Sequence, residues 1–507
     1  MAFEYFDPSF KFWGLKRRRP EVNYYNFIKF LGHLNIIKIR LNDRNHLAVV
    51  KGNIVETITI EQLSKLVLDK ILNRLPESYD FKERQMAANV IVEKSQKLYH
   101  SNTLNYLECK ELPIRRDSKN SCAINFSNGI LHIFAKEVEF EKHRDVKSLI
   151  LKSSIVDHEF SIEKERGDFR SFVWKVSGRT LNRYKALVCT LGYLAHRYKD
   201  PANPKIVILV DEIADEHNIA NGGRGKSLLL RCLKYIRNCE EIAGKTFQSS
   251  ARFAYQRVTI ATNNILINDV TKYESLDNFY NVSSDDFVIE RKFEKEEVIP
   301  YKYSPKIAIT ANNLLKQTEG FSSERRKHEI EISGYYGKHL NPKTDFGRTL
   351  FDEWDTEEWN RFYNFIAWSV SYYLKFGLVE APKININQRK LLNQVGPELT
   401  EYLDELLRLG KTKLHKKDTY NEFIKGGYLN RRYIPNQGSF TRKIKKYFEY
   451  RELNYREVPS DTRQYFEVLT QGGATDSEPT SIKDIEVDYQ LVKTKAKMSS
   501  ILKIIKE

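Results

Sequence analysis

The chain has 507 residues, of which 41% are hydrophobic and 30% charged, and its formal net charge is +16. This length and composition exclude a small disulfide-stabilised domain and predict about three globular domains, each with its own hydrophobic core. An excess of basic charge of this size favours a polyanionic partner such as nucleic acid, because released counterions supply much of the affinity. A basic surface that is merely solvated is the alternative.

The cysteines and the start of the chain indicate the compartment. The cysteines are odd in number, scattered and without a C-x-x-C pair, which argues against both a disulfide framework and a zinc site. No stretch approaches the ~18 apolar residues of a membrane span, and residues 1–7 carry acid where a signal peptide carries positive charge. We therefore expect a cytoplasmic protein without a membrane partner. The cysteines are Cys109, Cys122, Cys189, Cys232 and Cys239.

The first two segments mix strands and helices. Residues 1–110 contain β-like runs at 36–41 and 46–50 and a helical pattern at 60–67, which predicts a small α+β module. The next segment, 111–200, is expected to contain strands at 123–126 and 130–134 around a Ser-Asn-Gly turn, and then a helix over 184–195.

The remaining segments differ clearly in pattern. Residues 201–380 alternate apolar β-type runs with helical patterns, which predicts a parallel sheet in an α/β fold. Residues 381–470 read as helices and a short hairpin. Residues 471–507 form a linker by composition and then a charged tail.

A glycine-rich turn at Gly222–Ser227 is the most informative feature. Such a turn, ending in Lys-Ser at the start of a helix, presents backbone N–H groups to phosphate, while Lys226 reaches the β- and γ-phosphates and Ser227 holds Mg²⁺. The usual pattern has one more glycine where this chain has Ala220. The strand expected at 205–210 is also separated from the turn by a long polar stretch. A glycine turn that merely caps a helix is the alternative reading.

Two later strands end in polar residues that suit phosphoryl transfer. The strand predicted at 265–270 brings Asp269 to its end, where a carboxylate can hold Mg²⁺ or orient water. The strand predicted at 305–310 is followed by Asn312, which is placed to hydrogen-bond the γ-phosphate or the attacking water. Between them, residues 287–293 resemble a basic hairpin, and a pair of arginines follows at 325–326.

The order of these features resembles the superfamily 3 helicases, a branch of the AAA+ ATPases found in viruses, phages and plasmids. More closely, the chain is similar to the primase-helicase ATPases of phages and mobile elements of Bacteroidota. The resemblance covers about 200–380 and implies a P-loop ATPase core that uses ATP and Mg²⁺. The segments that carry it are 221–227, 267–270, 304–307, 321–326, 345–347 and 350–355.

The resemblance also implies roles by position. ATP would be bound by Gly222, Gly223, Arg224, Gly225, Lys226 and Ser227; Mg²⁺ would be held by Ser227 and Asp269; the sensor would be Asn312; a neighbouring subunit's ATP would be reached by Arg325 or Arg326; and DNA would be gripped by Arg291 and Lys292. One departure is Asn268, because the family usually has two adjacent acids here. Either Asp269 serves one role while Ser227 and water complete the metal shell, or hydrolysis is slow.

The flanking segments add a DNA-binding candidate but no convincing second active site. The acid pairs Glu137/Glu139 and Asp157/Glu159 alternate with apolar residues, which is typical of the wet face of a strand rather than of a primase metal site. Residues 411–470 hold fourteen Lys/Arg against seven Asp/Glu and predict a winged-helix-like DNA-binding module. Its exposed basic helix would present Arg442, Lys443, Lys445 and Lys446.

Together these patterns predict an ATP-dependent replicative DNA helicase of a phage or mobile element, working in the bacterial host cytoplasm. By resemblance it would form a ring, most simply a hexamer, translocate on single-stranded DNA and act on forked DNA beside a primase or polymerase. Two alternatives are a primase-helicase that synthesises primers and an ATP-binding initiator or origin-binding scaffold that hydrolyses ATP weakly.

Overall fold

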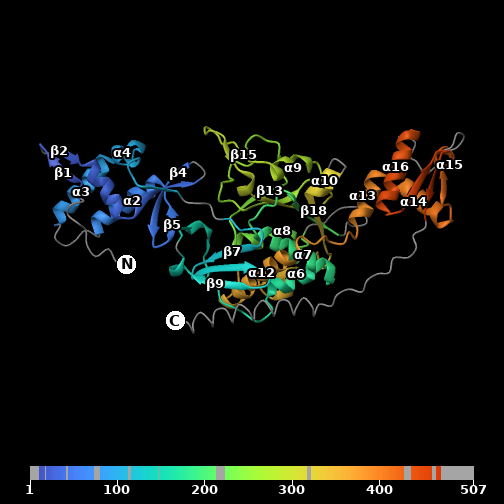
Figure 1. Ribbon diagram of the computed structural model, residues 1–507, viewed down its shortest axis with the longest axis horizontal. Helices are drawn as coiled ribbons and strands as arrows, with labels where there is room; N and C mark the ends of the chain where they lie inside the picture. Colours follow the sequence, from blue (N-terminus) through green and yellow to red (C-terminus); the bar gives the residue numbers. More distant parts are fainter. Residues whose placement is uncertain are drawn as a thin grey trace.

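The computed structural model describes residues 11–17, 19–41, 44–73, 80–111, 116–146, 148–212, 223–316, 321–426, 436–459 and 464–469. Within them the chain forms an N-terminal part, a central part that contains a parallel sheet, and a C-terminal part. These three parts follow one another along the longest axis of the molecule (Figure 1).

The N-terminal part packs helices against a hairpin and a mixed sheet of order β10-β5-β4-β3-β6. The strands expected at 36–41 and 46–50 and the helix at 60–67 are confirmed. The amphipathic pattern of α2 buries Leu63, Val67 and Ile71, one side chain per turn. The elements are β1 (Trp13–Lys16), β2 (Arg19–Val22), α1 (Tyr24–His33), β3 (Ile36–Leu41), β4 (Arg44–Lys51), β5 (Ile54–Thr57), α2 (Ile60–Asn73), α3 (Phe81–Glu93), α4 (Ser95–Leu98), α5 (Ser101–Leu104) and β6 (Cys109–Glu111).

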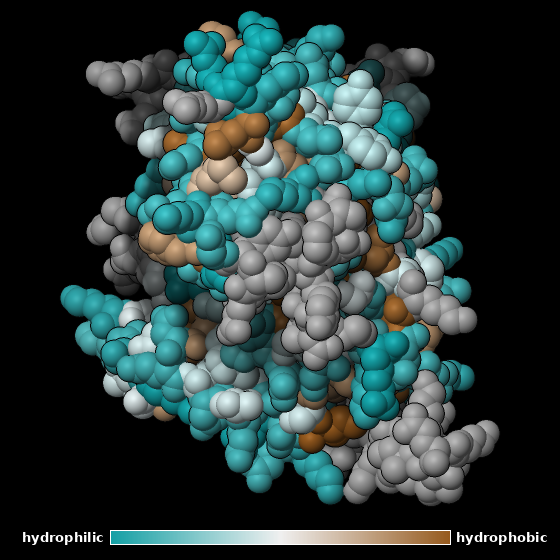
Figure 2. Space-filling view, turned by 90° about the vertical axis from the view of Figure 1, so that its left-hand side faces the viewer, coloured by the Kyte–Doolittle hydropathy of each residue, from teal (hydrophilic) through white to brown (hydrophobic). Residues whose placement is uncertain are grey.

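The outer face of this end of the molecule is mainly hydrophilic. Figure 2 shows scattered hydrophobic side chains on it and no broad hydrophobic area. Among the described residues, no helix is both long and apolar enough to cross a membrane.

A second sheet joins the N-terminal part to the centre. Its order is β11-β7-β8-β9, and the strands expected at 123–126 and 130–134 are confirmed as an antiparallel pair. The helix expected over 184–195 is confirmed as α7. The elements are β7 (Ser121–Phe126), β8 (Gly129–Phe134), β9 (Val138–Lys142), β10 (Ile150–Leu151), β11 (Ile155–Val156), α6 (Asp168–Val176) and α7 (Leu181–Ala195).

The parallel sheet expected in the central part is present. Its order is β13-β14-β17-β12-β18, so β12, the strand before the glycine turn, lies between β17 and β18, the last two strands of this sheet in chain order. The elements of this region are β12 (Ile206–Asp211), α8 (Lys226–Arg231), β13 (Cys239–Ala243), β14 (Asn264–Val270), α9 (Asp277–Ser284), β15 (Phe287–Ile289), β16 (Glu297–Ile299), β17 (Lys306–Ala311), α10 (Phe321–Arg326), β18 (Lys327–Ile332), α11 (Pro342–Phe346) and α12 (Thr356–Phe376).

Both faces of this sheet are covered, which explains the continuous apolar run of β12. Val207 and Leu209 join one hydrophobic core, and the alternating residues of the same strand join the other. The first core includes α7 and α12, which cross closely at Gly192. A Cβ at Gly192 would lie 2.2 Å from the carbonyl oxygen of Ser369, so only glycine fits this crossing.

The C-terminal part is a helical cluster with a small antiparallel sheet of order β19-β21-β20, and its first helix, α13, also packs on the central part through Ile386. Its own core includes Leu403, Phe423, Phe440 and Phe466. The predicted tail, 471–507, lies outside the described residues. The elements are α13 (Ile386–Gln394), α14 (Pro397–Arg408), β19 (Lys413–His415), α15 (Lys416–Lys425), α16 (Gln437–Tyr450), β20 (Tyr455–Val458) and β21 (Tyr465–Val468).

Candidate nucleotide site and nucleic-acid surfaces

Polar side chains from three neighbouring strands meet beside the glycine turn. Asp211 ends β12, Asp269 lies near the end of β14, and Asn312 directly follows β17. These strands are parallel, so all three residues lie at the carboxyl edge of the sheet, where open α/β sheets bind their ligands. Lys226 begins α8 at this same edge and connects the group.

Lys226 makes two direct contacts with these strand ends. Its Nζ lies 2.5 Å from Oδ1 of Asp211 and donates a hydrogen bond of 2.8 Å to Oδ1 of Asn312. The side chains of Lys226 and Asp211 are 4% and 1% exposed. Burial lowers the pKa of Lys226, although Asp211 and then Asp269 oppose this, and burial raises the pKa of Asp211. The structure thus brings together Lys226 and Asn312, two of the site residues that the sequence singled out.

The glycine turn has the backbone that its sequence requires. Gly223 and Gly225 have φ of 92° and 94°, a region that other residues rarely adopt. A Cβ on Gly225 would also lie 2.9 Å from the ring of Phe172. Gly222 lies outside the described residues. Arg224 donates from Nη1 to the carbonyl oxygens of residues 334 and 336, so its guanidinium fixes the neighbouring loop.

The oxygen atoms of Ser227 and Asp269 suit a hard divalent cation. Both residues are half-buried, and neither side chain makes a hydrogen bond within the described part of the chain. Hydroxyl and carboxylate oxygens are the ligands that Mg²⁺ prefers, with water completing its shell. Asp269 has φ of 58°, and its N–H donates to Oγ1 of Thr310, which fixes this turn at the strand end.

Asn268, which precedes Asp269 on β14, has a carboxylate partner of its own. Its Nδ2 donates a hydrogen bond of 2.7 Å to Oε1 of Glu241 on β13. Glu241 also pairs with Lys234. The amide of Asn268 is thus held by the neighbouring strand.

Sequence reasoning missed two residues of this site. Asp211 looked like the first residue of a polar connection, although a carboxylate directly after a buried strand was a usable signal. Arg389 of α13 donates from its two terminal nitrogens to the backbone oxygens of Asp211 and Asn312, at 2.7 and 3.2 Å. Nothing in the sequence connects α13 to these strand ends, because the contact depends on how the chain folds back.

Arg325 and Arg326 lie at the opposite edge of the sheet. Lys327, which follows them, pairs with Ile206 at the start of β12, whereas Asp211 ends that strand. The separation along β12 is ~17 Å at about 3.3 Å per residue. Arg325 is exposed, and Arg326 lies over the ring of Tyr280. Within one subunit these arginines are therefore distant from Lys226.

The basic hairpin is confirmed as the antiparallel pair of β15 and β16. Arg291 and Lys292 lie in its turn, but they differ in their contacts. Arg291 donates to the carbonyl oxygens of Gln256 and Val258 and pairs with Glu297 at 2.6 Å. Lys292 is exposed.

The basic residues of α16 also divide into two kinds. Arg442 is exposed, whereas Lys443 donates to the carbonyl oxygen of Val395 at 2.9 Å. Lys445 pairs with Glu457 and Lys446 with Glu449.

The acid pairs lie beside the second sheet: Glu139 is on β9, Glu137 directly precedes that strand, and Asp157 and Glu159 follow β11. All four side chains, Glu137, Glu139, Asp157 and Glu159, are exposed. Within the described residues no three metal-binding side chains cluster.

The fold and site together define a mixed α/β protein with a P-loop-like central sheet. No protein-family model matches the chain, and no curated protein matches it by sequence. Among solved structures, the chain is similar to the apo A form of the NrS-1 C-terminal region, with 14% identity, a TM-score of 0.41, and coverage of 88% of this chain and 99% of that one.

Two further solved structures are similar over part of the chain. One is Drosophila ORC bound to DNA, with 11% identity, a TM-score of 0.15, and coverage of 66% of this chain and 95% of that one. The other is a putative ATPase from Cytophaga hutchinsonii, with 9% identity, a TM-score of 0.21, and coverage of 54% and 84%. Likenesses of this strength carry no functional argument, which depends on the site itself.

Proposed function

We propose that the chain is an ATP-dependent replicative DNA helicase of a phage or mobile element. One observation carries the proposal: Lys226 of the glycine turn contacts Asp211 and Asn312 at the carboxyl edge of a parallel sheet, with Asp269 alongside. A lysine, a carboxylate and an amide at one strand edge are the groups that phosphoryl transfer from ATP requires.

In this proposal each group has a separate task. ATP would lie against the turn with its phosphates at Lys226, and Mg²⁺, held by Ser227 and Asp269, would neutralise charge on the phosphates. Asn312 would orient the attacking water. Its hydrogen bond from Lys226 fixes the position of its side chain, which supports this role.

The position of the arginines supports the proposed ring. Arg325 lies at the far edge of the sheet from its own Lys226, so it would complete the site of an adjoining subunit, most simply in a hexamer. The exposed side chain supports this role, because a guanidinium that reaches another chain must lie at the surface.

Two surfaces would bind DNA. Lys292 in the turn of the hairpin would contact the backbone of single-stranded DNA inside the ring. The order α14, β19, α15, α16, β20, β21 is that expected of a winged helix, with α16 as the helix that faces duplex DNA at a fork.

Strand displacement on a forked duplex tests the proposal. Wild-type protein with ATP and Mg²⁺ should separate the strands, whereas Asn312→Ala should not, and ATP hydrolysis should increase when single-stranded DNA is added. Asn45→Ala, on an exposed strand position of the N-terminal part, is the matched control. Hydrolysis that neither Asn312→Ala nor added DNA changes would rule the helicase out.

A second candidate, an ATP-binding initiator that hydrolyses weakly, is favoured by one observation. Asn268 holds the place of a second acid and is bonded to Glu241. Duplex binding in the presence of ATP without strand separation would select this candidate.

A further inference from the structure

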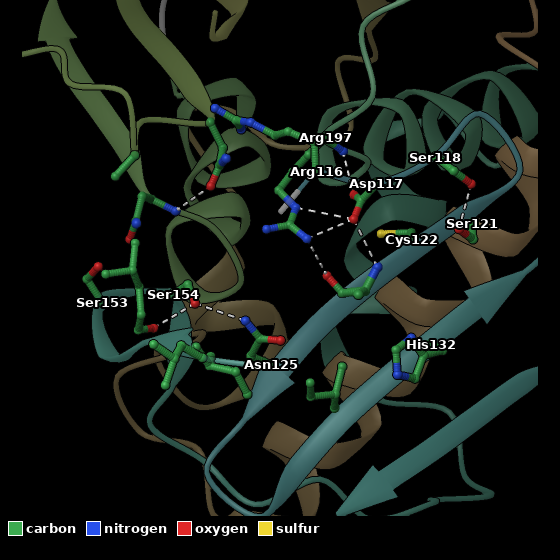
Figure 3. Close-up of a pocket in the computed structure, with 18 of the residues that line it drawn as sticks. Arg116, Asp117, Ser118, Ser121, Cys122, Asn125, His132, Ser153, Ser154 and Arg197 are labelled. Carbon is green, nitrogen blue, oxygen red and sulfur yellow. Dashed lines mark hydrogen bonds and ion pairs between the residues drawn. The ribbon is translucent and has the colours of Figure 1, made fainter. Parts of the chain in front are cut away.

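A cavity of about 370 Å³ lies at the amino edge of the central sheet, where β13 and β14 begin, whereas the site around Lys226 lies at the carboxyl edge. It is enclosed by β7 and β8, by the segment from β10 to Ser154, and by residues 260–263, which lead into β14 (Figure 3). A second hollow of about 250 Å³ shares Arg197, Ser153 and Asn263 with it, so the two are adjacent.

Two arginines form the charged wall of this cavity. Arg116 donates from Nη2 to the carbonyl oxygens of Ile260 and Tyr303, at 3.0 and 2.6 Å. Arg197 donates from Nε and Nη2 to Oδ1 of Asp117. In both guanidinium groups, Nη1 makes no hydrogen bond with the described residues. Each arginine is therefore fixed from one side and keeps donors for a ligand on the other.

The basic side chains behind this wall outnumber the acidic ones. Arg237, Lys199 and Lys306 lie buried next to the two arginines, and within the described residues Asp117 is the one carboxylate that pairs with any of these five basic side chains. Lys199 and Lys306 are held by neutral oxygens instead. A buried excess of positive charge is unfavourable unless an anion compensates it.

The pKa values of Lys199 and Arg116 are lowered, as expected where basic side chains are buried close together. Burial, reinforced by Arg116, lowers the pKa of Lys199 to about 7. Burial, reinforced by Arg197, lowers the pKa of Arg116 to about 10. An anion in the cavity would stabilise the charged forms of both side chains.

The rest of the wall suits a planar heterocycle. Ile130, Ile150 and Ile260 supply apolar surface, and the amides of Asn125, Asn238 and Asn263 supply donors and acceptors. Asn125 donates to Ser154 at 2.9 Å, which fixes its orientation. A volume of this size is at the lower end of small-molecule sites and matches one nucleotide rather than a large cofactor.

We propose that this cavity is a binding site for a single phosphate-bearing nucleotide, separate from the ATP site of the proposed function. The arginine pair would bind the phosphate through paired N–H donors, and the apolar and amide wall would bind the base. Asn263 directly precedes β14 and Asp269 lies near its far end, so ~20 Å separates these two residues along the strand at about 3.3 Å per residue. The nucleotide is either free in solution or the end of a nucleic-acid strand.

Titration calorimetry on the full chain tests this proposal, with thymidine 5′-monophosphate as the probe and thymidine as the ligand without phosphate. Wild-type protein should bind the monophosphate at least about tenfold more tightly than thymidine, because the phosphate makes charge-assisted bonds. Ser153→Asp places a carboxylate on the exposed rim of the cavity and should weaken monophosphate binding at least about tenfold without removing any contact of the fold.

Ala261→Trp, which fills the cavity by volume, should have the same effect. Ser101→Asp, which makes the same charge change on α5, should leave monophosphate binding unchanged. Asn312→Ala in the ATP site should also leave it unchanged, so this experiment can succeed or fail independently of the proposed ATP site. The proposal is overturned if thymidine binds as tightly as its monophosphate, or if Ser153→Asp and Ala261→Trp both bind like wild type. Competition by 5′-phosphorylated oligothymidylate supports a strand end as the source, and its failure to compete supports a free nucleotide.

Discussion

Lys226 and Asp211 form a buried ion pair at the centre of the candidate nucleotide site, with Nζ 2.5 Å from Oδ1. The lysine that is expected to contact ATP is thus already held by a carboxylate from the strand before its own turn. Phosphate oxygens entering the site would share Nζ with Asp211 or displace it. This relationship makes the usual test of a phosphate-binding lysine more complicated, because the same side chain has a structural role.

Replacing the lysine alone should therefore affect stability as well as activity. Lys226→Met leaves Asp211 buried without its counter-charge, and we expect the free energy of unfolding to fall by about 3–5 kcal/mol. The paired change Lys226→Met with Asp211→Asn removes both charges and should recover most of this loss. Urea denaturation of the three proteins measures the effect.

The paired variant also isolates the catalytic role of the lysine. It should fold and yet hydrolyse ATP at least about 100-fold more slowly than wild type, because a fixed charge on the phosphates is missing. Asp211→Asn alone is the control for the second change. Wild-type hydrolysis by the paired variant would show that Lys226 is structural only.

Arg325→Ala should abolish ATP hydrolysis, and mixing this variant with a second inactive variant should restore part of the activity. If the arginine acts on a neighbouring subunit, mixing Arg325→Ala with Asn312→Ala creates interfaces that combine an intact site with an intact arginine. ATPase activity should then reappear in the mixture although each variant alone is inactive. Lys343→Ala, which changes a surface cation on α11, should behave as wild type, and a mixture as inactive as its components would contradict the shared site.

The sequence was informative about the sheet because its strands are buried on both faces. Continuous apolar runs such as 206–210 and 265–267 are typical of strands covered on both faces, and the polar residues that follow parallel strands lie at one edge of the sheet. The glycine-turn pattern assigned Lys226 to the phosphates, and the position after a strand assigned Asn312 to the same place; the two side chains are hydrogen-bonded to each other.

What the sequence could not provide is the direction in which a long cationic side chain points. Arg291 and Lys292 are neighbours in the chain, yet Arg291 turns inward to carbonyl oxygens and Lys292 stays exposed. Arg389 reaches the site from a helix whose approach is set by tertiary packing. Such contacts leave no periodic signal, so only the folded structure shows them.

Stability should decrease in mild acid because of His196. Burial, reinforced by Lys306, lowers the pKa of His196 to about 4, while the ring titrates near 6.5 in the unfolded chain. The unfolded state therefore binds the proton first. The stability is complete above about pH 6.5 and falls by about 3 kcal/mol as the pH drops to about 4.

Thermal denaturation between pH 7 and pH 4, a window set by these values, measures this loss. His196→Gln is the control. A glutamine amide can still donate to the carbonyl oxygens of Ser118 and Ser121, which the His196 ring contacts, but the amide does not titrate. Its pH profile should be flatter than that of wild type. Identical profiles would mean that other groups cause the acid sensitivity.

Two variants in the hairpin turn should distinguish an effect on stability from an effect on DNA binding. Lys292→Ala should leave the free energy of unfolding within about 0.5 kcal/mol of wild type, as for exposed positions, and reduce the stimulation of hydrolysis by single-stranded DNA. Arg291→Ala should instead destabilise the protein by about 1–3 kcal/mol, because the carbonyl oxygens of Gln256 and Val258 lose their donor. The two measurements are urea denaturation and DNA-dependent ATPase activity. If Lys292→Ala retains full stimulation, the hairpin does not grip DNA.

Two variants on α16 should distinguish the same two effects, on stability and on DNA binding. Arg442 is exposed, so Arg442→Ala should weaken duplex binding nearly equally for all sequences and reduce the slope of log K against log salt by about 1, as loss of one phosphate contact does. Lys443 is tied to the carbonyl oxygen of Val395, and Lys443→Ala should mainly lower stability. Fluorescence anisotropy with a labelled duplex at several salt concentrations measures the slope. An unchanged slope in Arg442→Ala would mean that duplex DNA contacts another face of the C-terminal part, and the winged-helix assignment would then lose its main functional support.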